Sequence, residues 1–248
     1  MIRKIIIEAV RDCLVKSPGK KTLRHAVTSG RRRTNAFGGG RIKEGNMQLS
    51  LILAHPDPAS FNHAIAQAAL EAVQANAHTV FFHDLYREKF DPLLPALEMA
   101  RDATLPDSIR QHCDEIAAAD GIIIIHPNWW GQPPAILKGW VDRVIRPGVA
   151  YEFLEGDQGE GVPIGLLKAR NVFVYNTSNT EPEREINIFG DPLETLWKNC
   201  IFGLCGVSGF YRRMFNVVVT STKDTRKKWL DSVREDMDMI FPCVKSSS

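Results

Sequence analysis

Short apolar runs alternate with longer amphipathic segments from residue 47 to the end of the chain. The short runs, rich in β-branched and aromatic residues, predict strands at residues 48–54, 78–84, 121–125, 171–175 and 211–219. The longer segments predict helices at residues 62–76, 107–118, 134–144, 191–204 and 222–240. A helix is therefore predicted after every strand.

This alternation is typical of a doubly wound α/β sheet, because consecutive strand–helix units form parallel sheets with right-handed crossovers. The run of isoleucines at residues 122–125 has no polar position, as expected for a strand covered by helices on both faces. We therefore predict a three-layer α/β/α domain with a five-stranded parallel sheet in the order 2-1-3-4-5.

Composition places the chain among soluble globular proteins. Its 248 residues are 44% apolar and 24% charged, and no apolar run approaches the roughly 20 residues that span a bilayer. The five cysteines are odd in number and none are spaced C-x-x-C, which argues against a disulfide framework or a zinc site and favours a reducing, cytoplasmic compartment. Cys200 and Cys205 fall in an apolar helical segment and are predicted to be small core residues.

Charge is uneven along the chain. Residues 1–46 hold 12 Lys/Arg against 3 Asp/Glu, a net of +9, and residues 47–248 hold 19 against 26, a net of −7. The first segment has little apolar periodicity and is predicted to be a disordered, dispensable extension. The alternatives are a basic tail for membrane or nucleic acid, a transit peptide, and translated upstream sequence. The predicted domain covers residues 47–242, and residues 243–248 form a tail.

The residues between the first predicted strand and helix, 55–62, read His-Pro-Asp-Pro-Ala-Ser-Phe-Asn. The first N–H groups of a helix lack partners inside the helix, and the helix dipole adds positive charge there. Ser60 and Asn62 are both suitable caps, so this loop predicts a phosphate or other anion site. The alternative is that Pro, Asp and Ser serve turn geometry alone.

Two further polar loops follow the third and fourth predicted strands. The first contains Trp129, Trp130 and Gly131, and the second covers residues 176–180. Ligands of doubly wound sheets bind beyond the carboxyl ends of the strands, between strands 1 and 3 in this order. A planar ligand stacked on a tryptophan, with Gly131 permitting close approach, explains the first loop better than tryptophans that only cap the core.

Other site types find less support. The chain lacks the G-x-S-x-G, G-x-x-x-x-G-K-[ST] and G-x-G-x-x-G signatures at suitable places. The seven histidines show no metal spacing, so no metal site is predicted. For His126 a turn role is at least as good an explanation as a chemical one.

Four motifs carry a resemblance to a known family: residues 55–62, Asp-Leu-Tyr at 84–86, Pro-Asn-Trp-Trp-Gly-Gln-Pro-Pro-Ala-Ile-Leu-Lys-Gly-Trp at 127–140, and Ala-Tyr-Glu-Phe at 150–153. With these, the chain from residue 47 to 242 resembles the NAD(P)H:quinone oxidoreductases of the flavodoxin-like superfamily. That group includes bacterial modulator-of-drug-activity proteins and potassium-efflux ancillary reductases. The resemblance implies a flavodoxin-like fold and non-covalent FAD, less often FMN.

The resemblance also implies roles for individual residues. The positions that match those around the flavin phosphates are His55, Ser60, Phe61 and Asn62. The positions that match the loop along the isoalloxazine ring are Pro127, Asn128, Trp129, Trp130 and Gly131. The positions that match the loop at the polar edge of the ring are Asn176, Thr177, Ser178 and Asn179. With Trp130, the aromatic residues Tyr151 and Phe153 match positions that line the pocket, often across a dimer interface.

The implied activity is hydride transfer from NADH or NADPH to quinone-like acceptors by a ping-pong mechanism, in a homodimer. The flavin supplies the chemistry, so no catalytic side chain is assigned. The loop after the fourth strand lacks the Tyr and His that mammalian members carry, with Phe189 where the His is expected. This departure puts the proton relay and the quinone preference in doubt, but not flavin binding.

Two alternatives remain open. The first is a flavin-binding regulatory subunit of a partner such as an ion channel, which includes a peripheral membrane partner. The second is an FMN-dependent azo- or nitroreductase. No nucleic-acid partner is expected.

Overall fold

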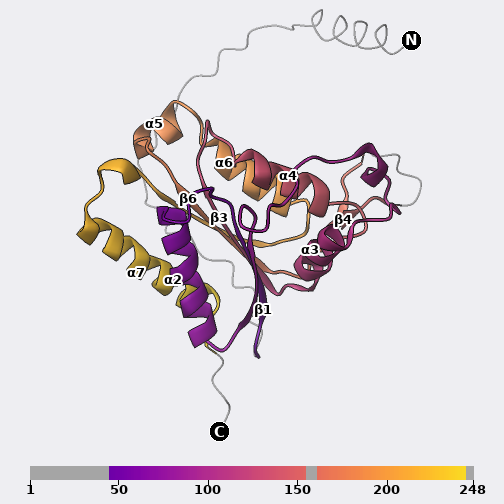
Figure 1. The fold of residues 1–248 in the computed structure, drawn as a ribbon, viewed down its shortest axis with the longest axis horizontal. Helices are drawn as coiled ribbons and strands as arrows, with labels where there is room; N and C mark the ends of the chain where they lie inside the picture. The colour runs from indigo at the N-terminus through magenta and orange to yellow at the C-terminus, as the bar shows by residue number, and fades with distance from the viewer. Residues whose placement is uncertain (1–44, 155–160, 244–248) are drawn as a thin grey trace, which may run out of the picture. The chain divides into compact units, whose positions relative to one another are not determined.

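Five strands form one parallel sheet at the centre of the fold (Figure 1). Their order is β2-β1-β3-β6-β7, which confirms the predicted order 2-1-3-4-5 when only the main sheet is counted. The strands are β1 (Gln48–Leu53), β2 (Thr79–Asp84), β3 (Gly121–Pro127), β6 (Asn171–Thr177) and β7 (Gly209–Phe215). A separate two-residue hairpin pairs β4 (Tyr151–Glu152) with β5 (Ile164–Gly165).

The computed structural model describes residues 45–154 and 161–243. The predicted basic extension, residues 1–46, and the predicted tail, residues 243–248, therefore lie almost wholly outside the described residues. Their assignment stays a prediction.

Helices cover both faces of the sheet (Figure 1). One face carries α2 (Phe61–Ala75) and α7 (Lys223–Ile240), and the other carries α3 (Asp107–Ala118), α4 (Ala135–Val144) and α6 (Pro192–Glu194). A π-helical segment, η2 (Thr195–Phe202), continues α6, and α5 (Pro182–Asn187) follows β6. The predicted three-layer, flavodoxin-like arrangement is confirmed.

The isoleucines of β3 explain why that strand reads as one apolar run. Ile122 and Ile124 pack into the core on the side of α3 and α4, whereas Ile123 and Ile125 pack into the core under α2 and α7. All are fully buried, at about 1.5–3 kcal/mol for each side chain. These apolar faces suit the position of β3 as the central strand of the sheet, covered by helices on both sides.

Several boundaries differ from the predicted ones. β3 and β6 each run two residues further, so His126 and Asn176 are strand residues rather than loop residues. β7 ends at Phe215 and not at 219, because Val217 adopts a left-handed conformation (φ 55°) before the 3₁₀ turn η3 (Val218–Thr220). The short elements α5, η1 (Ala96–Glu98) and β4–β5 were not predicted.

The prediction that Cys200 is a core residue is wrong. Cys205 is buried as expected, but Cys200 is exposed. The buried side chains of η2 are Trp197, Ile201 and Phe202, spaced four and five residues apart, and this spacing turns Cys200 to the outside.

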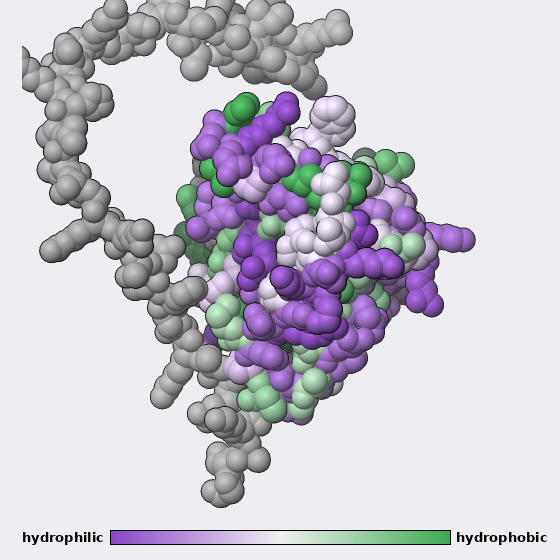
Figure 2. All heavy atoms as spheres, turned by 90° about the vertical axis from the view of Figure 1, so that its left-hand side faces the viewer, coloured by the Kyte–Doolittle hydropathy of each residue, from purple (hydrophilic) through white to green (hydrophobic). Residues whose placement is uncertain are grey.

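The face on the side of α7 is mostly hydrophilic, with apolar side chains scattered over it (Figure 2). Among the described residues no helix combines the length and apolar character required to cross a membrane.

Candidate functional site

The loops after β1, β3 and β6 meet around one cavity of about 350 Å³. Because the strands are parallel, their carboxyl ends share one edge of the sheet, and the cavity lies at the switch point between β1 and β3. The residues that line it are His55, Ser60, Phe61, Asn62, Pro127, Asn128, Trp129, Thr177, Ser178, Asn179, Thr180, Val218, Val219 and Arg226. Most of the predicted cofactor residues are therefore brought together.

The N-terminus of α2 opens into this cavity. Ser60 caps the helix by accepting a hydrogen bond from the His63 N–H at 3.4 Å. The Nδ1 atom of His55 accepts from the Asp57 N–H at 3.1 Å, so the proton of the neutral ring lies on Nε2. Burial is the main cause that lowers the pKa of His55, with a smaller contribution from His63 and opposition from Asp57. This wall of the cavity is thus made of donors, which suits an anion.

Asn62 is the most informative residue of the wall. It is 2% exposed, and its Nδ2 donates to the Thr177 hydroxyl at 2.9 Å, while its Oδ1 is the one buried side-chain atom without a partner among the described residues. The Thr177 hydroxyl can donate or accept, so one end of the amide stays unpaired in either orientation. A buried polar group without a partner costs about 1–3 kcal/mol. The free Oδ1 therefore gives the cavity a polar position that a donor group of a ligand could occupy.

A chain of hydrogen bonds through His63 and Asp84 holds the Ser60 side chain in place. His63 contacts the Ser60 hydroxyl through Nδ1 at 3.0 Å and the Asp84 carboxylate through Nε2 at 3.1 Å. Asp84 is the first residue of the Asp-Leu-Tyr motif, so this chain links two of the motifs noted in the sequence. A second cavity, of about 450 Å³, adjoins the three residues, but their polar atoms already bond to one another. We therefore assign Ser60, His63 and Asp84 a structural role, in which they hold the loop after β1 in place.

The loop after β3 closes with a tight two-residue turn. Trp129 and Gln132 exchange backbone hydrogen bonds of 3.0 Å in both directions, and Trp130 and Gly131 have φ values of 58° and 72°, as in a type I′ turn. A Cβ on Gly131 would lie 2.7 Å from Cγ of Pro192. The sequence explained Gly131 by close approach of a ring, but the fold itself already requires this glycine. Substitution of Gly131 is therefore no clean test of the cofactor.

Trp130 combines full exposure with a strained backbone. Its relative exposure is 102%, and a non-glycine residue in the left-handed region costs of order 1–3 kcal/mol. Such strain is kept mainly where function requires it. Trp130 does not line the cavity within one chain, in contrast to its neighbour Trp129.

We expect that Trp130→Asn leaves the free energy of unfolding unchanged or raises it by up to about 1 kcal/mol, because asparagine tolerates this conformation. Turnover should fall at least tenfold if the ring covers a ligand. Ala77, exposed with φ 63°, provides the matched control. Ala77→Asn should leave turnover unchanged, and a Trp130→Asn variant with full turnover would remove the ring from the site. Urea unfolding and steady-state rates measure both effects.

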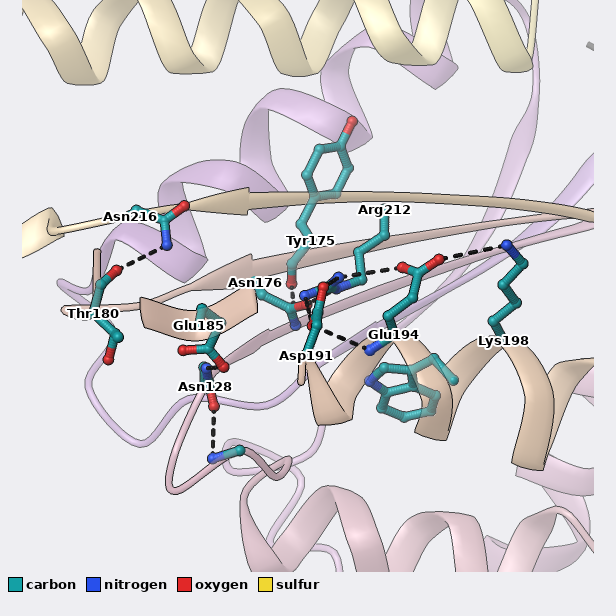
Figure 3. A network of polar contacts seen from close by, with 12 residues as sticks. Asn128, Tyr175, Asn176, Thr180, Glu185, Asp191, Glu194, Lys198, Arg212 and Asn216 are labelled. Carbon is teal, nitrogen blue, oxygen red and sulfur yellow. Dashed lines mark hydrogen bonds and ion pairs between the residues drawn. The ribbon is translucent and has the colours of Figure 1, made fainter. Parts of the chain in front are cut away.

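A buried polar network supports the loops from beneath (Figure 3). His126 is wholly buried, donates from Nδ1 to the Pro127 carbonyl at 2.8 Å, and faces Trp197 Nε1 at 3.0 Å and Asn176 Nδ2 at 2.8 Å with its Nε2 lone pair. Burial, aided by the charge of Arg212 and opposed by the Pro127 hydrogen bond, lowers the pKa of His126 to about 4. The ring is therefore a neutral structural acceptor within β3, and the predicted turn role of His126 is wrong.

Arg212 of β7 completes this network. Its Nε donates to the Asn176 Oδ1 at 2.9 Å, and its terminal nitrogens donate to the Asp191 carboxylate at 2.6 and 2.7 Å and to Glu194 at 3.2 Å (Figure 3). Both ends of the Asn176 amide are thereby used. The sequence placed Asn176 against the cofactor, whereas the structure places it under the loops.

Asn128 ties the loop after β3 to α5. Its Oδ1 accepts from the Gly131 N–H at 2.9 Å, and its Nδ2 donates to Glu185 of α5 at 2.8 Å (Figure 3).

Tyr151 and Phe153 form an edge-to-face pair with ring centroids 5.8 Å apart, but neither lines the cavity in a single chain. Within a single chain, the structure therefore does not place these two residues in the pocket, as the resemblance had implied.

Thr180 lines the cavity as a member of the predicted loop 176–180, but the sequence analysis missed Val218, Val219 and Arg226. The Arg226 guanidinium donates to the Ser221 hydroxyl at 2.8 Å and to the Val218 carbonyl at 3.0 Å, which holds a positive charge at the cavity. The sequence could have predicted them, because the loop after the fifth strand starts at the same edge of the sheet as the other loops that line the cavity.

Comparison with known proteins decides the family. A model of the flavodoxin-like fold matches residues 47–237. The chain belongs to this family. It is 33% identical over 190 residues to an uncharacterized NAD(P)H oxidoreductase of Haemophilus influenzae, with 75% of this chain and 91% of that protein covered. It is 31% identical over 221 residues to NAD(P)H dehydrogenase [quinone] 1 of Rattus norvegicus, with 77% and 79% covered.

Solved structures agree with this assignment. The flavodoxin-like chain superposes on Smu.1420 of Streptococcus mutans with a TM-score of 0.66 and 31% identity, over 78% of this chain and all of that one. It superposes on the NAD(P)H:quinone oxidoreductase of Methanothermobacter marburgensis with a TM-score of 0.64, at 24% identity and over 77% and 95% of the two chains, which shows a shared fold. The predicted resemblance, and the predicted class of NAD(P)H oxidoreductase of the quinone-reductase type, are confirmed.

Proposed function

We propose that this protein is a flavoprotein that transfers hydride from NADH or NADPH to quinone-like acceptors in a ping-pong mechanism. The observation that carries this proposal is the unpaired, buried amide oxygen of Asn62 in the cavity at the N-terminus of α2. A flavin would offer hydroxyl donors to the free oxygen of Asn62 and phosphate acceptors to the N–H groups of this wall. The names of the family relatives support the reaction class.

The residues of the cavity fit a flavin by their chemistry. The N–H groups of α2, the His55 ring proton and the Arg226 guanidinium suit phosphate. The loops with Trp129 and Thr177 to Thr180 suit a planar ring with a polar edge. When bound, a flavin accepts hydride from a nicotinamide and passes it to a second substrate, and the protein contributes orientation and electrostatics.

FAD is the proposed flavin, with FMN as the alternative. The same fold holds FMN in an FMN-dependent NADH-azoreductase of Bacillus anthracis, a likeness of fold at 14% identity and a TM-score of 0.62. The cavity of about 350 Å³ lies at the small end of the usual range for ligand pockets, roughly 300–1,000 Å³. A second chain would add to it.

We propose a homodimer that completes the pocket. Apolar side chains are exposed beside the loop after β3: Trp130 at its tip, and Ile186, Ile188 and Phe189 on and after α5, which Asn128 links to that loop. Such a concentration marks an interaction surface. Tyr151 and Phe153 would then reach the pocket of the other chain. Light scattering that finds a fully active monomer at micromolar concentration would reject the dimer.

The cytoplasmic location of the protein also stays a proposal.

One experiment tests the function directly. The purified protein is assayed with NADPH or NADH and menadione, and the flavin released by heat is identified by chromatography. The proposal expects a bound flavin, steady turnover, and parallel double-reciprocal lines. A bound flavin without turnover would favour the regulatory-subunit alternative, and FMN with turnover on azo dyes would favour an azoreductase. Absence of any flavin after reconstitution would overturn the proposal.

Asn62 gives a sharper test of the site. Asn62→Leu keeps the size of the side chain and removes both the unpaired oxygen and the hydrogen bond to Thr177. These two effects oppose each other, so the unfolding free energy of the ligand-free protein should change by less than about 1 kcal/mol. Flavin should bind about 10–100-fold more weakly, as for the loss of one buried hydrogen bond of about 1–3 kcal/mol. Titration of apoprotein with flavin measures the affinity. A variant that binds flavin as the parent does would show that Asn62 does not contact it.

A further inference from the structure

A second group of polar side chains lies on the other side of the sheet, against α3. His83 is on β2, Glu88 follows that strand, and His112 is on α3. The Nδ1 atom of His83 lies 3.0 Å from Glu88 Oε1, and the Nε2 atom of His112 lies 3.5 Å from Glu88 Oε2. One ligand atom from each residue lies within 4.8 Å of the other two. Both histidines are buried.

We propose that His83, Glu88 and His112 bind a divalent cation of the zinc type. Around a tetrahedral ion with bonds of about 2.1 Å, neighbouring ligand atoms are about 3.4 Å apart. The separations of 3.0 and 3.5 Å, which run to the two different oxygens of Glu88, are close to this spacing. Because the three ligand atoms all lie within 4.8 Å of one another, side-chain movements alone would draw them together around an ion. Two imidazoles and one carboxylate select zinc and similar transition ions over magnesium and calcium, which prefer oxygen ligands.

The surroundings of His83 suit a metal ligand. Its Nε2 contacts the Glu115 carboxylate at 2.5 Å, which orients the ring with Nδ1 toward Glu88. A carboxylate on the far nitrogen of a ligating histidine is the usual support in metal sites, because it fixes the ring and raises its basicity. The ring of His112 lies 3.9 Å from that of His83, so the pair is already assembled.

His112 must change its tautomer to bind. Trp140 Nε1 donates to His112 Nδ1 at 3.2 Å, which leaves the His112 proton on Nε2, facing Glu88. The His112 proton would move from Nε2 to Nδ1, which ends the Trp140 hydrogen bond, and the Nδ1 proton of His83 would be released to solvent as the cation binds. The exchange gives up one hydrogen bond between neutral groups, whereas the cation gains a bond to each of the three ligand atoms. The exchange therefore favours the cation.

The cluster is open on one side and separate from the flavin cavity. A cavity of about 390 Å³ is lined by all three residues and has room for a water as fourth ligand. It shares no lining residue with the cavity at the ends of β1, β3 and β6. No residue spacing predicts this site, because its ligands come from two elements and a turn that only the fold brings together.

The test uses the full-length protein, freed of metal by a chelator. Calorimetric titration with zinc chloride should show one ion bound per chain with micromolar or tighter affinity, and cobalt(II) chloride should give the absorption spectrum of tetrahedral coordination. His83→Gln, His112→Gln and Glu88→Gln should each weaken binding at least 100-fold. Glu88 is partly exposed, so its variant is expected to fold even if a histidine variant does not.

His78 provides the matched control. It is also a buried histidine with both ring nitrogens hydrogen-bonded, to Met47 and Phe241, but it lies outside the cluster. His78→Gln should bind zinc as the parent does. Failure of the parent to bind zinc, or equal binding by parent and Glu88→Gln, would overturn the proposal. Turnover is not needed for the readout, so the result does not depend on the proposed flavin function.

Discussion

Arg212→Gln is expected to lower the free energy of unfolding by about 3–5 kcal/mol and to weaken flavin binding at least tenfold. The side chain of Arg212 is 8% exposed and holds Asp191 by two short hydrogen bonds (Figure 3). Removing one partner of a buried ion pair leaves the other charge uncompensated, which costs about this much. The side-chain Oδ1 of Asn176 also loses its donor, so the end of β6 is held less firmly where the strand enters its loop.

Arg213 on the same strand separates general destabilisation from an effect on the site. It forms a similar two-bond pair with Asp236 at 2.6 and 2.7 Å, on the side of α7. Arg213→Gln should also lower stability, but flavin affinity, measured well below the unfolding transition, should stay within about twofold. Equal loss of affinity in both variants would show that the network of Arg212 has no special relation to the site.

His126 should make the protein sensitive to acid. The folded state keeps this ring neutral with a pKa of about 4, whereas in the unfolded chain the ring takes up a proton at its usual pKa of 6.5. Protonation therefore favours the unfolded chain. The contribution of His126 to stability is complete above pH 6.5 and is lost as the pH falls toward 4, with a total on the order of 3 kcal/mol.

Urea unfolding of the parent and of His126→Gln between pH 8 and pH 4 isolates this contribution. Carboxylates titrate in both proteins, so only the difference between the two curves reports His126. The parent should lose stability more steeply than the variant between pH 6.5 and 4. Parallel curves would mean that His126 is not held neutral by its surroundings.

The sequence alone was sufficient for the architecture and for the outline of the site. The strands and helices of the main sheet follow from local periodicity, and the fully apolar β3 marks the centre of the sheet by itself. The rule that ligands bind at the carboxyl ends of parallel strands then brought the loops after β1, β3 and β6 together. His55, Asn62 and Thr177 line the cavity as this reasoning predicts.

Only the tertiary structure decided which polar groups remain available for a ligand. Asn176 and Asn62 look alike in the sequence, but Arg212 and His126 use both ends of the Asn176 amide, while Asn62 keeps one end unpaired. Likewise, the requirement for Gly131 comes from Pro192, and the pairing of His83 with His112 comes from packing of α3 against β2. Hydrogen bonds and close contacts join residues that are far apart in the chain. Periodicity therefore predicts which face of an element a side chain lies on, but not which partners it contacts.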